Sequence, residues 1–463
     1  MTHERTVDVL AIGAGPANLS LAALAAPAAT HLSLAVIEAR ESASWHPGLL
    51  WSNSRLQVSG VKDLVSLVDP RSRFSFLNFL REQRRLYRHL IAARDHVSRK
   101  EFDQYLTWAA SLLGVEFDTR AVAVDHDGDR FRVTTNHGVV HASHLVLGVG
   151  QEPFVPPCAA DLDDPRIWHS SRHTNRGLPA LDKDVLLVGG GQSAAEVALD
   201  ILSGRTGLPR RLTWVTGRGG LSPLDDSAFS DEWFNPRYVE YFHGLPHTRR
   251  SALLDGQHAA TAGISRDLLS ALYRRLYEID YLDPPGCGHR LLSGTSLVNL
   301  AVTAEGFTCT LRDEPGTATR EIHGDAVVFA TGFRHRIPRF LDPIRNRLPI
   351  EGETFRVDRD YRIPWDGPDT NRIYIQNGAL RSHGVADPNL SLAAWRSAVV
   401  LNSVLDKEYY HLDGEDITLS LPPSPVADFD EARFGDADFG AHTRSNASSR
   451  DPAPNAHIVE RGS

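Results

Sequence analysis

Two stretches of this chain share one pattern, in which an apolar run leads into a glycine cluster and then into small residues at helical spacing. The first reads DVLAIGAGPANLSLA over residues 8–22, and the second reads DVLLVGGGQSAAEVALDIL over residues 184–202. A buried parallel strand that feeds a tight turn and a helix is typical of this pattern. Its presence twice in 463 residues predicts an α/β protein with two such units.

The first unit has the features of a dinucleotide-binding turn. Gly13 permits the sharp turn, and Gly15 lets a pyrophosphate approach the backbone at the N-terminus of the following helix. The third glycine position of the fingerprint is Asn18. A second apolar strand over residues 32–37 ends in Glu38, where a carboxylate binds ribose hydroxyls. The residues predicted to bind this dinucleotide are Gly13, Gly15, Asn18 and Glu38.

The second unit has alanine at the third position, which is the G/A variant of the same fingerprint. Its next strand, 212–215, is followed by Arg218 and has no acid at the ribose position. An arginine there suits the 2′-phosphate of NADPH rather than NADH, although a solvated loop charge is the alternative. The residues predicted to bind this dinucleotide are Gly189, Gly191, Gln192, Ser193 and Arg218.

Two dinucleotide sites on one chain predict FAD together with NADPH, because a bound flavin takes hydride from a nicotinamide. The chain order then predicts an NADPH domain, 161–334, inserted into a discontinuous Rossmann-like FAD domain, 1–160 with 335–420. Segment 221–290, rich in aromatic residues and arginine, is expected to line a substrate pocket. Residues 421–463 are rich in Pro, Ala, Asp and Ser, and this composition predicts disorder.

Composition excludes several classes of function. Lys+Arg number 49 against 58 Asp+Glu, a net charge of −9, so no basic surface for nucleic acid is expected. The three cysteines form no CxxC motif, and the N-terminus has no signal peptide, which together predict a cytoplasmic protein. No apolar run is long enough to span a membrane. The 21 histidines show no HxH or HExxH pattern, so no metal is expected.

The segment WHPGLLWSNSRLQVSGVKDLVSLVDPRSRFSFLNFL at 45–80 narrows the choice among flavin enzymes. It resembles the N-hydroxylating flavin monooxygenases of siderophore pathways, which act on lysine, ornithine or diamines. The resemblance runs from about residue 7 to residue 405. It includes RKEFDQYLTWAA at 99–110, DDSAFSDEWFNPRY at 225–238, ATGF at 330–333 and HGVADPNLSLAAWRSA at 383–398.

This resemblance implies a mechanism in which no protein side chain is the reacting group. NADPH reduces FAD, reduced FAD and O2 form a hydroperoxide, and NADP stays bound to shield it. The substrate's terminal amine then attacks the distal oxygen. The resemblance also implies a homo-oligomer. An oxidase-like or Baeyer–Villiger flavoprotein and a nucleotide-sensing regulator are the alternatives from other classes.

The resemblance also assigns site residues. Trp45, His46, Gln57, Asp387 and Leu390 would contact the flavin, although core packing or, for Asp387, capping of the turn before Pro388 are structural alternatives. Lys62 would bind a substrate carboxylate unless it forms a surface pair with Asp63. Asp231 would bind an ammonium, and Ser391 would orient the amine.

Departures from the ornithine branch of the family bear on the choice of substrate. Ornithine enzymes of the family carry asparagines in two blocks, which here read Phe229-Ser230-Asp231-Glu232 and 258–263 without asparagine. These departures argue against L-ornithine. Lys62 with Asp231 suits the zwitterionic end of L-lysine, whereas a diamine such as cadaverine or putrescine has no carboxylate for Lys62. L-lysine is therefore the expected substrate, and a diamine remains the alternative.

Overall fold

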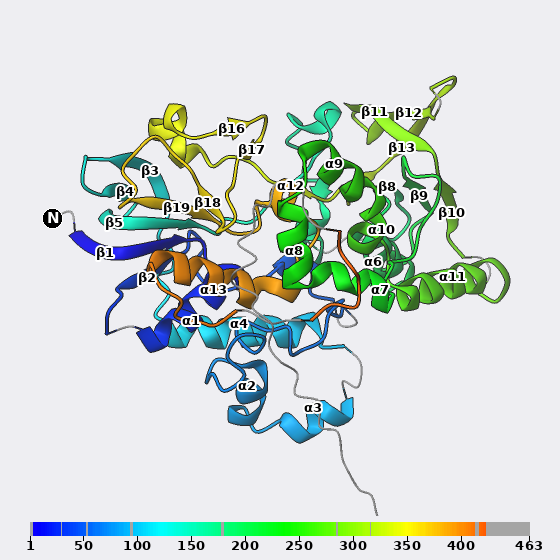
Figure 1. Ribbon diagram of the computed structural model, residues 1–463. Helices are drawn as coiled ribbons and strands as arrows, with labels where there is room; N and C mark the ends of the chain where they lie inside the picture. The colour runs from blue at the N-terminus through cyan, green and yellow to red at the C-terminus, as the bar shows by residue number, and fades with distance from the viewer. Residues whose placement is uncertain are drawn as a thin grey trace, which may run out of the picture. The chain divides into compact units, whose positions relative to one another are not determined.

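The computed structural model describes residues 3–28, 30–51, 54–92, 96–176, 180–283, 286–314, 316–412 and 416–422. They form a mixed α/β structure with two main sheets, each built around parallel strands and each carrying one of the glycine turns (Figure 1). The fold class predicted from the two glycine patterns is therefore confirmed. Apart from its first two residues, the tail predicted to be disordered lies outside the described residues.

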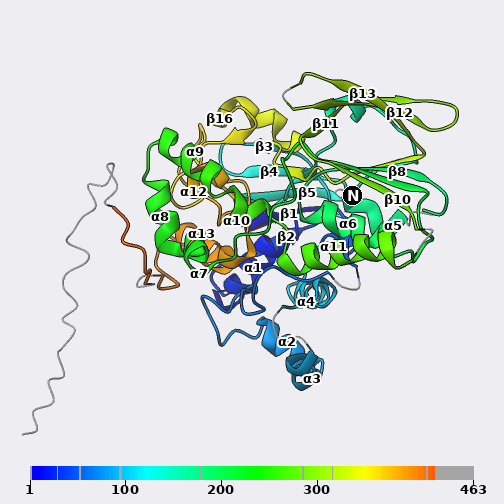
Figure 2. The same cartoon turned by 90° about the vertical axis from the view of Figure 1, so that its right-hand side faces the viewer.

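The first sheet has seven strands. Its main path runs β18-β19-β5-β1-β2, and β3 and β4 extend it as an antiparallel pair from β5. Strand β1 pairs with β2 on one side and with β5 on the other, and β5 also pairs with β19. All three pairings are parallel. Helices α1, α4 and α13 lie together on one side of this sheet (Figures 1 and 2). The elements are β1 (His3–Ile12), α1 (Pro16–Ala25), β2 (Leu34–Ile37), α4 (Arg99–Leu112), β3 (Ala121–His126), β4 (Phe131–Thr135), β5 (Gly138–Leu147), β18 (Arg362–Ile363), β19 (Arg372–Ile375) and α13 (Ala393–Val404).

The second sheet has five strands in the order β10-β9-β8-β14-β7, all parallel. Helix α6 follows the glycine turn, and α11 packs beside it. A three-stranded antiparallel sheet, β11-β12-β13, belongs to the same part of the chain. The elements are β7 (Ile167–His169), β8 (Asp184–Val188), α6 (Gln192–Leu202), β9 (Arg211–Val215), α11 (Arg266–Tyr281), β10 (Gly288–Leu292), β11 (Thr295–Val302), β12 (Phe307–Asp313), β13 (Thr319–Gly324) and β14 (Ala326–Phe329).

Every strand of the second sheet falls between β5 and β18 of the first sheet, so the second unit is inserted into the first. The two segments that cross between the sheets, β6 (Glu152–Pro153) and β15 (Phe333–Arg334), pair with each other in antiparallel register. The Phe154 N–H also donates to the Gly332 carbonyl at 2.9 Å. The insertion therefore leaves and re-enters through one two-stranded ribbon, while domain boundaries at 160 and 334 stay a prediction.

Shorter elements lie along the chain between the strands and helices of the two sheets. Helices α7 to α10 fall within segment 221–290, whose role as a pocket wall stays a prediction. No helix of the described residues is long and apolar enough to cross a membrane. These shorter elements are η1 (Ala26–Ala28), η2 (Pro47–Leu49), α2 (Phe76–Glu82), α3 (Leu86–Ala92), η3 (Pro157–Ala159), η4 (Ser170–Arg172), α5 (His173–Arg176), α7 (Ala228–Asp231), η5 (Glu232–Phe234), α8 (Pro236–His243), α9 (His247–Gly256), α10 (His258–Ala262), η6 (Arg339–Arg347), β16 (Ile350–Glu351), β17 (Thr354–Phe355), α12 (Leu380–His383) and η7 (Leu390–Leu392).

Candidate active site

The first glycine turn leaves an open space at the N-terminus of α1. Gly13 has φ +97°, and a Cβ there would lie 2.5 Å from the Gly148 carbonyl oxygen, so the fold itself requires glycine. Gly15 differs, because its φ is −74° and a Cβ would meet no heavy atom of the described structure within 4 Å. Free backbone N–H groups at a helix N-terminus beside open space suit a pyrophosphate.

Glu38 lies directly against this turn. Its carboxylate accepts hydrogen bonds from the Ala14 N–H at 2.9 Å and from Arg40 Nε at 3.0 Å. Burial raises the pKa of Glu38, but the hydrogen bonds from Arg40 and Ala14 and the charge of Arg40 outweigh it, so the net shift is downward. An ionised carboxylate beside the turn is suited to accept hydrogen bonds from ribose hydroxyls, as the sequence predicts.

Asn18 has its side chain inside the protein rather than in the open space. Its Nδ2 donates to the Gly13 carbonyl at 2.8 Å, and its Oδ1 accepts from Gln376 Nε2 at 3.1 Å. A Cβ on Gly148 would lie 2.4 Å from the Asn18 amide, so the turn closes tightly over this side chain. The structure thus gives the side chain a role in shaping the turn, and a direct contact of Asn18 with the dinucleotide stays a prediction.

Trp45 and His46 lie where the segment after the Glu38 strand approaches the second sheet. The Trp45 backbone N–H donates to Asp103 Oδ1 at 2.6 Å, and the Trp45 and His46 rings meet edge to face with their centroids 4.8 Å apart. The His46 ring also contacts Phe333, in the ribbon that leads back from the second sheet, at 5.8 Å. Gln57 is exposed. The flavin contacts of Trp45, His46 and Gln57 stay a prediction.

The environment of His46 disfavours a positive charge. The side chain is exposed to solvent on one side, and protein atoms surround the rest of the ring. This surrounding protein, followed by the charges of Arg99 and Arg40, lowers the pKa of His46 to about 4. The imidazole is therefore neutral at physiological pH.

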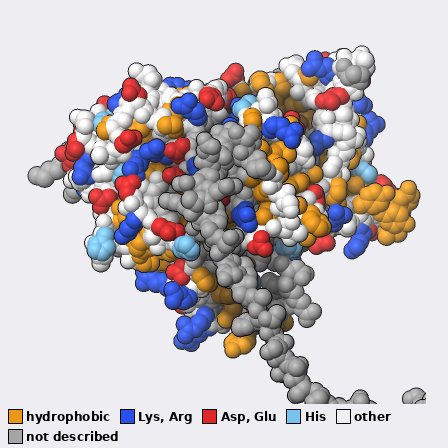
Figure 3. Space-filling model, viewed as in Figure 1, with side chains coloured by type: hydrophobic (Ala, Val, Ile, Leu, Met, Phe, Trp, Pro, Cys, Tyr) orange, Lys and Arg blue, Asp and Glu red, His pale blue; other side chains and the backbone are white. Residues whose placement is uncertain are grey.

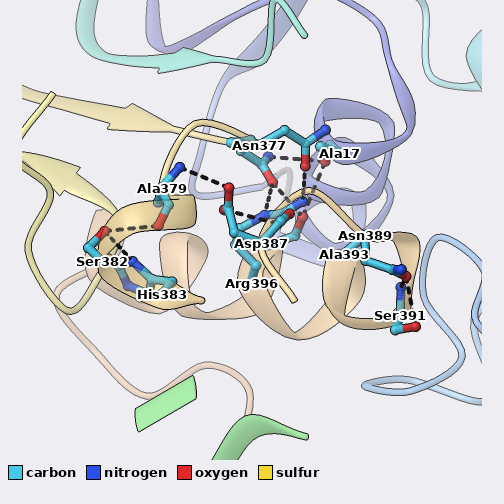
Figure 4. Close-up of polar contacts among 12 residues, drawn as sticks. Ala17, Asn377, Ala379, Ser382, His383, Asp387, Asn389, Ser391, Ala393 and Arg396 are labelled. Atoms are coloured by element: carbon cyan, nitrogen blue, oxygen red, sulfur yellow. Dashed lines mark hydrogen bonds and ion pairs between the residues drawn. The ribbon is translucent and has the colours of Figure 1, made fainter. Parts of the chain in front are cut away.

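Asp387 and Arg396 form a buried ion pair next to the first sheet (Figure 4). The two residues are 2% and 1% exposed, and Arg396 Nη1 lies 3.3 Å from Asp387 Oδ1. Asp387 Oδ2 accepts from the Ala379 N–H at 2.8 Å, so Asp387 does not cap the turn before Pro388, and that alternative is wrong. The cap of the next turn is Asn389, whose Oδ1 accepts from the Ser391 N–H at 2.9 Å.

Arg396 connects this segment to the first glycine turn. Its Nε donates to Gln376 Oε1 at 3.1 Å, and its Nη2 donates to Asn377 Oδ1 at 2.6 Å. Gln376 in turn donates to Asn18 and to the Ala17 carbonyl, which closes a chain of polar contacts to α1. Sequence analysis did not single out Arg396, although a charged residue inside the apolar helix SLAAWRSAVVL is a signal that could have identified it.

Lys62 is half-buried, and no carboxylate of the described residues lies within ion-pair distance of its ammonium. The alternative of a surface pair with Asp63 is wrong, because Asp63 is 3% exposed and turned inward. Its carboxylate accepts hydrogen bonds from the backbone of Val65, Ser66 and Phe76 and from the Ser66 hydroxyl, at 2.7–2.9 Å. Lys62 therefore keeps its charge available for another partner.

Ser20 of α1 brings the Lys62 and Ser391 segments together. Its buried hydroxyl contacts the Leu64 carbonyl at 2.6 Å and the Ala393 carbonyl at 3.3 Å. Each of these carbonyls is two residues from a predicted substrate contact. The Ser391 hydroxyl is 2% exposed and donates to Asn389 Oδ1 at 2.8 Å, so its lone pairs remain able to accept an N–H.

Asp231, the third predicted substrate contact, ends the short helix α7. Its side chain is exposed, and within the described part of the chain its carboxylate makes no hydrogen bond or ion pair. The neighbouring Ser230 donates to Asp225 at 2.6 Å, which fixes this turn without Asp231. The structure does not bring Asp231 into contact with Lys62 or Ser391, and its role stays a prediction.

At the second glycine turn, as at the first, one glycine is required by the fold and another faces open space. Gly189 has φ +145°, and a Cβ would lie 2.1 Å from the Ala330 carbonyl oxygen, whereas at Gly191 the nearest atom would be 4.0 Å away. Gln192 uses its amide internally, donating to Glu196 Oε1 and accepting from the Ser265 N–H, both at 2.9 Å. Ser193 is half-buried. Open space again faces the N-terminus of a helix, here α6.

Arg218 lies against this second turn rather than extending freely into solvent. Its Nη1 donates to the Gly190 carbonyl at 3.1 Å and to the Ala262 carbonyl at 2.7 Å. Burial lowers the pKa of Arg218, and no carboxylate of the described residues pairs with it. The alternative of a solvated loop charge therefore does not fit, and the guanidinium keeps donors free for a phosphate.

We expect Arg218→Ala to weaken NADPH binding by roughly 1–3 kcal/mol and to leave NADH binding nearly unchanged, because only NADPH carries the 2′-phosphate. KM values for the two nucleotides measure the effect. Arg211→Ala, which changes an exposed arginine of the same sheet, is the matched control. Equal losses for both nucleotides would show that Arg218 does not read the 2′-phosphate.

The described residues contain no cluster of three or more His, Cys, Asp and Glu side chains arranged to hold a metal ion.

Comparison with known proteins agrees with this geometry. Residues 5–335 match the family model of L-lysine 6-monooxygenase/L-ornithine 5-monooxygenase. An Escherichia coli protein named L-lysine N6-monooxygenase is 35% identical over 428 residues, which cover 91% of this chain and 98% of that protein.

Two solved structures share the fold. DfoA bound to FAD, the cadaverine monooxygenase of the desferrioxamine pathway of Erwinia amylovora, has a TM-score of 0.83 at 30% identity, covering 90% of this chain and 99% of that one. The ornithine N-hydroxylase KtzI of Kutzneria sp. 744, with reduced FAD, NADP+ and L-ornithine, has a TM-score of 0.80 at 28% identity, covering 87% and 99%. The chain therefore belongs to the L-lysine 6-monooxygenase/L-ornithine 5-monooxygenase family, flavin-dependent N-monooxygenases that use FAD and NADPH.

Proposed function

We propose that this enzyme N-hydroxylates the side-chain amine of L-lysine, with O2 as co-substrate, and supplies N6-hydroxylysine for a hydroxamate siderophore. The observation that carries the proposal is Lys62, a half-buried lysine without a carboxylate partner among the described residues. It belongs to a segment that Ser20 joins to the Ser391 segment. The 35% identity to an enzyme named for L-lysine supports the same choice.

The reaction requires the substrate amine to lose its proton. A primary aliphatic amine has a pKa of about 10.4 in water, and only its neutral form is nucleophilic. The surroundings that lower the pKa of His46 to about 4 also disfavour an ammonium group placed close to it. When bound and reduced by NADPH, FAD supplies the oxygen chemistry. The task of the protein is to hold a neutral amine in a site from which water is excluded.

The proposed contacts divide the substrate into two ends. Lys62 binds the carboxylate, Asp231 binds the α-ammonium, and Ser391 accepts an N–H from the reacting amine. At that end Ser391 is suited to accept rather than donate, because its hydroxyl proton is directed at Asn389. Trp45, His46, Gln57, Asp387 and Leu390 are proposed to contact FAD, and Gln192 and Ser193 to contact NADPH.

A diamine is the second candidate, favoured by the likeness to a structure named as a cadaverine monooxygenase. Cadaverine and putrescine carry an ammonium where lysine carries a carboxylate, so Lys62 would repel them unless its charge were directed elsewhere. L-ornithine is the third candidate. The alternatives from other enzyme or regulator classes are excluded by the family assignment.

We expect Lys62→Ala to raise the KM for L-lysine on the order of 10- to 100-fold, the effect of losing a hydrogen bond to a charged group. The flavin content should not change, because the contact is remote from the reacting nitrogen. Steady-state hydroxylamine formation with lysine, ornithine, cadaverine and putrescine measures it. Lys100→Ala, at an exposed lysine of α4, is the control.

The same panel of amines decides between the candidates. The lysine proposal fails if cadaverine or putrescine has a much larger kcat/KM than lysine, or if Lys62→Ala affects all four amines equally. The assignment to the N-hydroxylase family does not depend on this result.

A further inference from the structure

The second unit is attached to the first at a place separate from the ribbon of β6 and β15. There the segment 47–51 of the first unit lies against η4 and α5 of the second. A Cβ on Gly48 would lie 1.9 Å from the Ser171 carbonyl oxygen, so the two backbones touch. The Thr174 hydroxyl also donates to the Pro47 carbonyl at 2.8 Å. The two units are therefore closely packed at this place.

A buried ion pair also joins the two units. Arg99, the first residue of α4, and Glu196 of α6 share two hydrogen bonds, Nη1 to Oε2 and Nη2 to Oε1, both at 2.9 Å. Their side chains are only 12% and 8% exposed. Such a two-point contact between a guanidinium and a carboxylate is the stronger kind of ion pair.

The burial of this pair distinguishes it from the other charges of the protein. Basic and acidic side chains are scattered over the face seen in Figure 3, where they are solvated. Ion pairs of that exposed kind contribute little to holding two parts of a protein together. The other described ion pairs between the two units are exposed as well, and they are Arg237–Asp416 and Arg359–Glu240.

The buried pair connects the first unit with the second glycine turn. On one side, Arg99 Nη1 donates to the Leu49 carbonyl at 3.5 Å, and Leu49 is 4% exposed in the hydrophobic core of the second unit. On the other side, Glu196 Oε1 accepts from Gln192 Nε2 at 2.9 Å. Gln192 is the first residue of α6, directly after Gly191. A continuous set of polar contacts therefore leads from the first unit to the turn predicted to bind NADPH.

The ribbon alone would leave the inserted unit free to pivot. Each of its two strands has only two residues, and short connections of this kind absorb the backbone rotation at a hinge. A second attachment, from α4 to α6, restricts that rotation. Because each unit carries one glycine turn, the same attachment bears on the distance between the two turns.

We propose that Glu196 is a positioning residue for the reduction of FAD, and that it acts by holding the second glycine turn in a fixed place relative to the first. In this step a hydride, one proton with two electrons, passes from NADPH to oxidised FAD, and NADP+ remains. The transfer requires the two rings in near contact, and a misplacement of about 1 Å costs on the order of 100-fold in rate. Glu196 acts through Arg99 and Gln192 and takes no part in the transfer itself. The proposal goes beyond the choice of amine and stands for any of the candidate substrates.

Anaerobic stopped-flow absorbance of the FAD-loaded protein mixed with NADPH tests the proposal. We expect Glu196→Gln to lower the limiting rate constant of flavin reduction about 10- to 100-fold. The amide has the size of the carboxylate, but it has no charge and presents an NH2 group to the donors of Arg99 or Gln192. The dissociation constant of NADP+, measured by isothermal titration calorimetry without turnover, should stay within about threefold of the wild-type value, because the lost contact is not one to the nucleotide.

Arginine variants show whether the two side chains act as one unit. Arg99→Met should slow reduction to a similar extent, and the double variant of Arg99→Met and Glu196→Gln should be no slower than either single variant. Arg99→Lys keeps the charge but cannot form both bonds, so an intermediate rate is expected, and it serves as the test if Glu196→Gln loses FAD. Asp184→Asn is the matched control and should be reduced at the wild-type rate. Its partner Arg210, 3.0 Å away, lies in the same unit.

FAD content and Tm of each variant establish that it is folded. The proposal is overturned if Glu196→Gln is reduced at the wild-type rate, if Asp184→Asn is slowed as much, or if the two single effects multiply in the double variant. It is also overturned if the affinity for NADP+ falls in proportion to the rate, because Glu196 would then serve the nucleotide site itself.

Discussion

Gly15→Val is expected to give a folded protein that contains no FAD and has no activity. A side chain at position 15 meets no heavy atom of the described protein within 4 Å, and the φ of −74° suits any residue. The cost therefore arises only when a pyrophosphate has to approach the same backbone. The ratio of flavin absorbance to protein absorbance measures the loss, and circular dichroism shows that the fold is retained.

Two matched variants make this result specific. Gly191→Val should keep its FAD and lose reduction by NADPH, because position 191 has equivalent space at the second turn. Gly13→Val should fail at an earlier stage, since φ +97° and a contact of 2.5 Å with the Gly148 carbonyl are incompatible with the fold itself. If Gly191→Val lost flavin while Gly15→Val retained it, the order of the two sites would be reversed.

Arg396→Met should lower the free energy of unfolding by about 3–5 kcal/mol, the effect of breaking a buried ion pair by removing one partner. The substitution leaves Asp387, Gln376 and Asn377 without the donor that their oxygens share. Methionine fills a similar volume, so the loss reflects the charge and the hydrogen bonds rather than a cavity. Urea unfolding followed by circular dichroism measures the change.

The destabilisation should also depend on pH. Burial raises the pKa of Asp387, and Arg396 is the main group opposing that shift, so the variant carboxyl has a higher pKa still. A group whose pKa is raised in the folded state stabilises the fold below its unfolded pKa, and this stability is lost as pH rises through the folded pKa. Arg396→Met should therefore be less destabilised at pH 5 than at pH 8.

Asp387→Asn in the Arg396→Met background is the control, because the amide has the size of the carboxylate but no charge. It should recover part of the stability and abolish the pH dependence. A destabilisation by Arg396→Met that is identical at both pH values would contradict an ionised Asp387 held by Arg396.

Much of the fold could be predicted because the glycine turns are local patterns. Strand, turn and helix follow one another within about 20 residues, so the sequence alone indicates where Gly13 and Gly189 must bend the chain. The insertion of one unit into the other could be read from chain order. The approach of Glu38 to the first turn was also predictable, since the second strand of such a unit ends beside the first.

The polar contacts between distant segments could not be predicted in the same way. Ser20 contacts a carbonyl 373 residues away, and Gln376 contacts Asn18 across 358 residues. No local spacing indicates such pairs. The direction of Asp63 was likewise undetermined, because its sequence neighbours allow both a surface pair with Lys62 and the inward turn that the structure shows. The side chains that shape a site are set by tertiary packing more than by pattern.

The ribbon formed by β6 and β15 has a consequence for engineering. Because the chain leaves and re-enters the first unit side by side, residues 155–331 form a cassette bounded by one hydrogen-bonded seam. A chimera that takes this cassette from another protein of the same fold would have to match the backbone pairing of Pro153 with Phe333. It would also have to keep contacts between the two units, such as the Arg99–Glu196 ion pair at 2.9 Å and the hydrogen bond from Thr174 to the Pro47 carbonyl at 2.8 Å. Coenzyme preference could then be exchanged as a module without redesign of the first glycine turn, but the cassette also carries segment 221–290, which is predicted to line the substrate pocket.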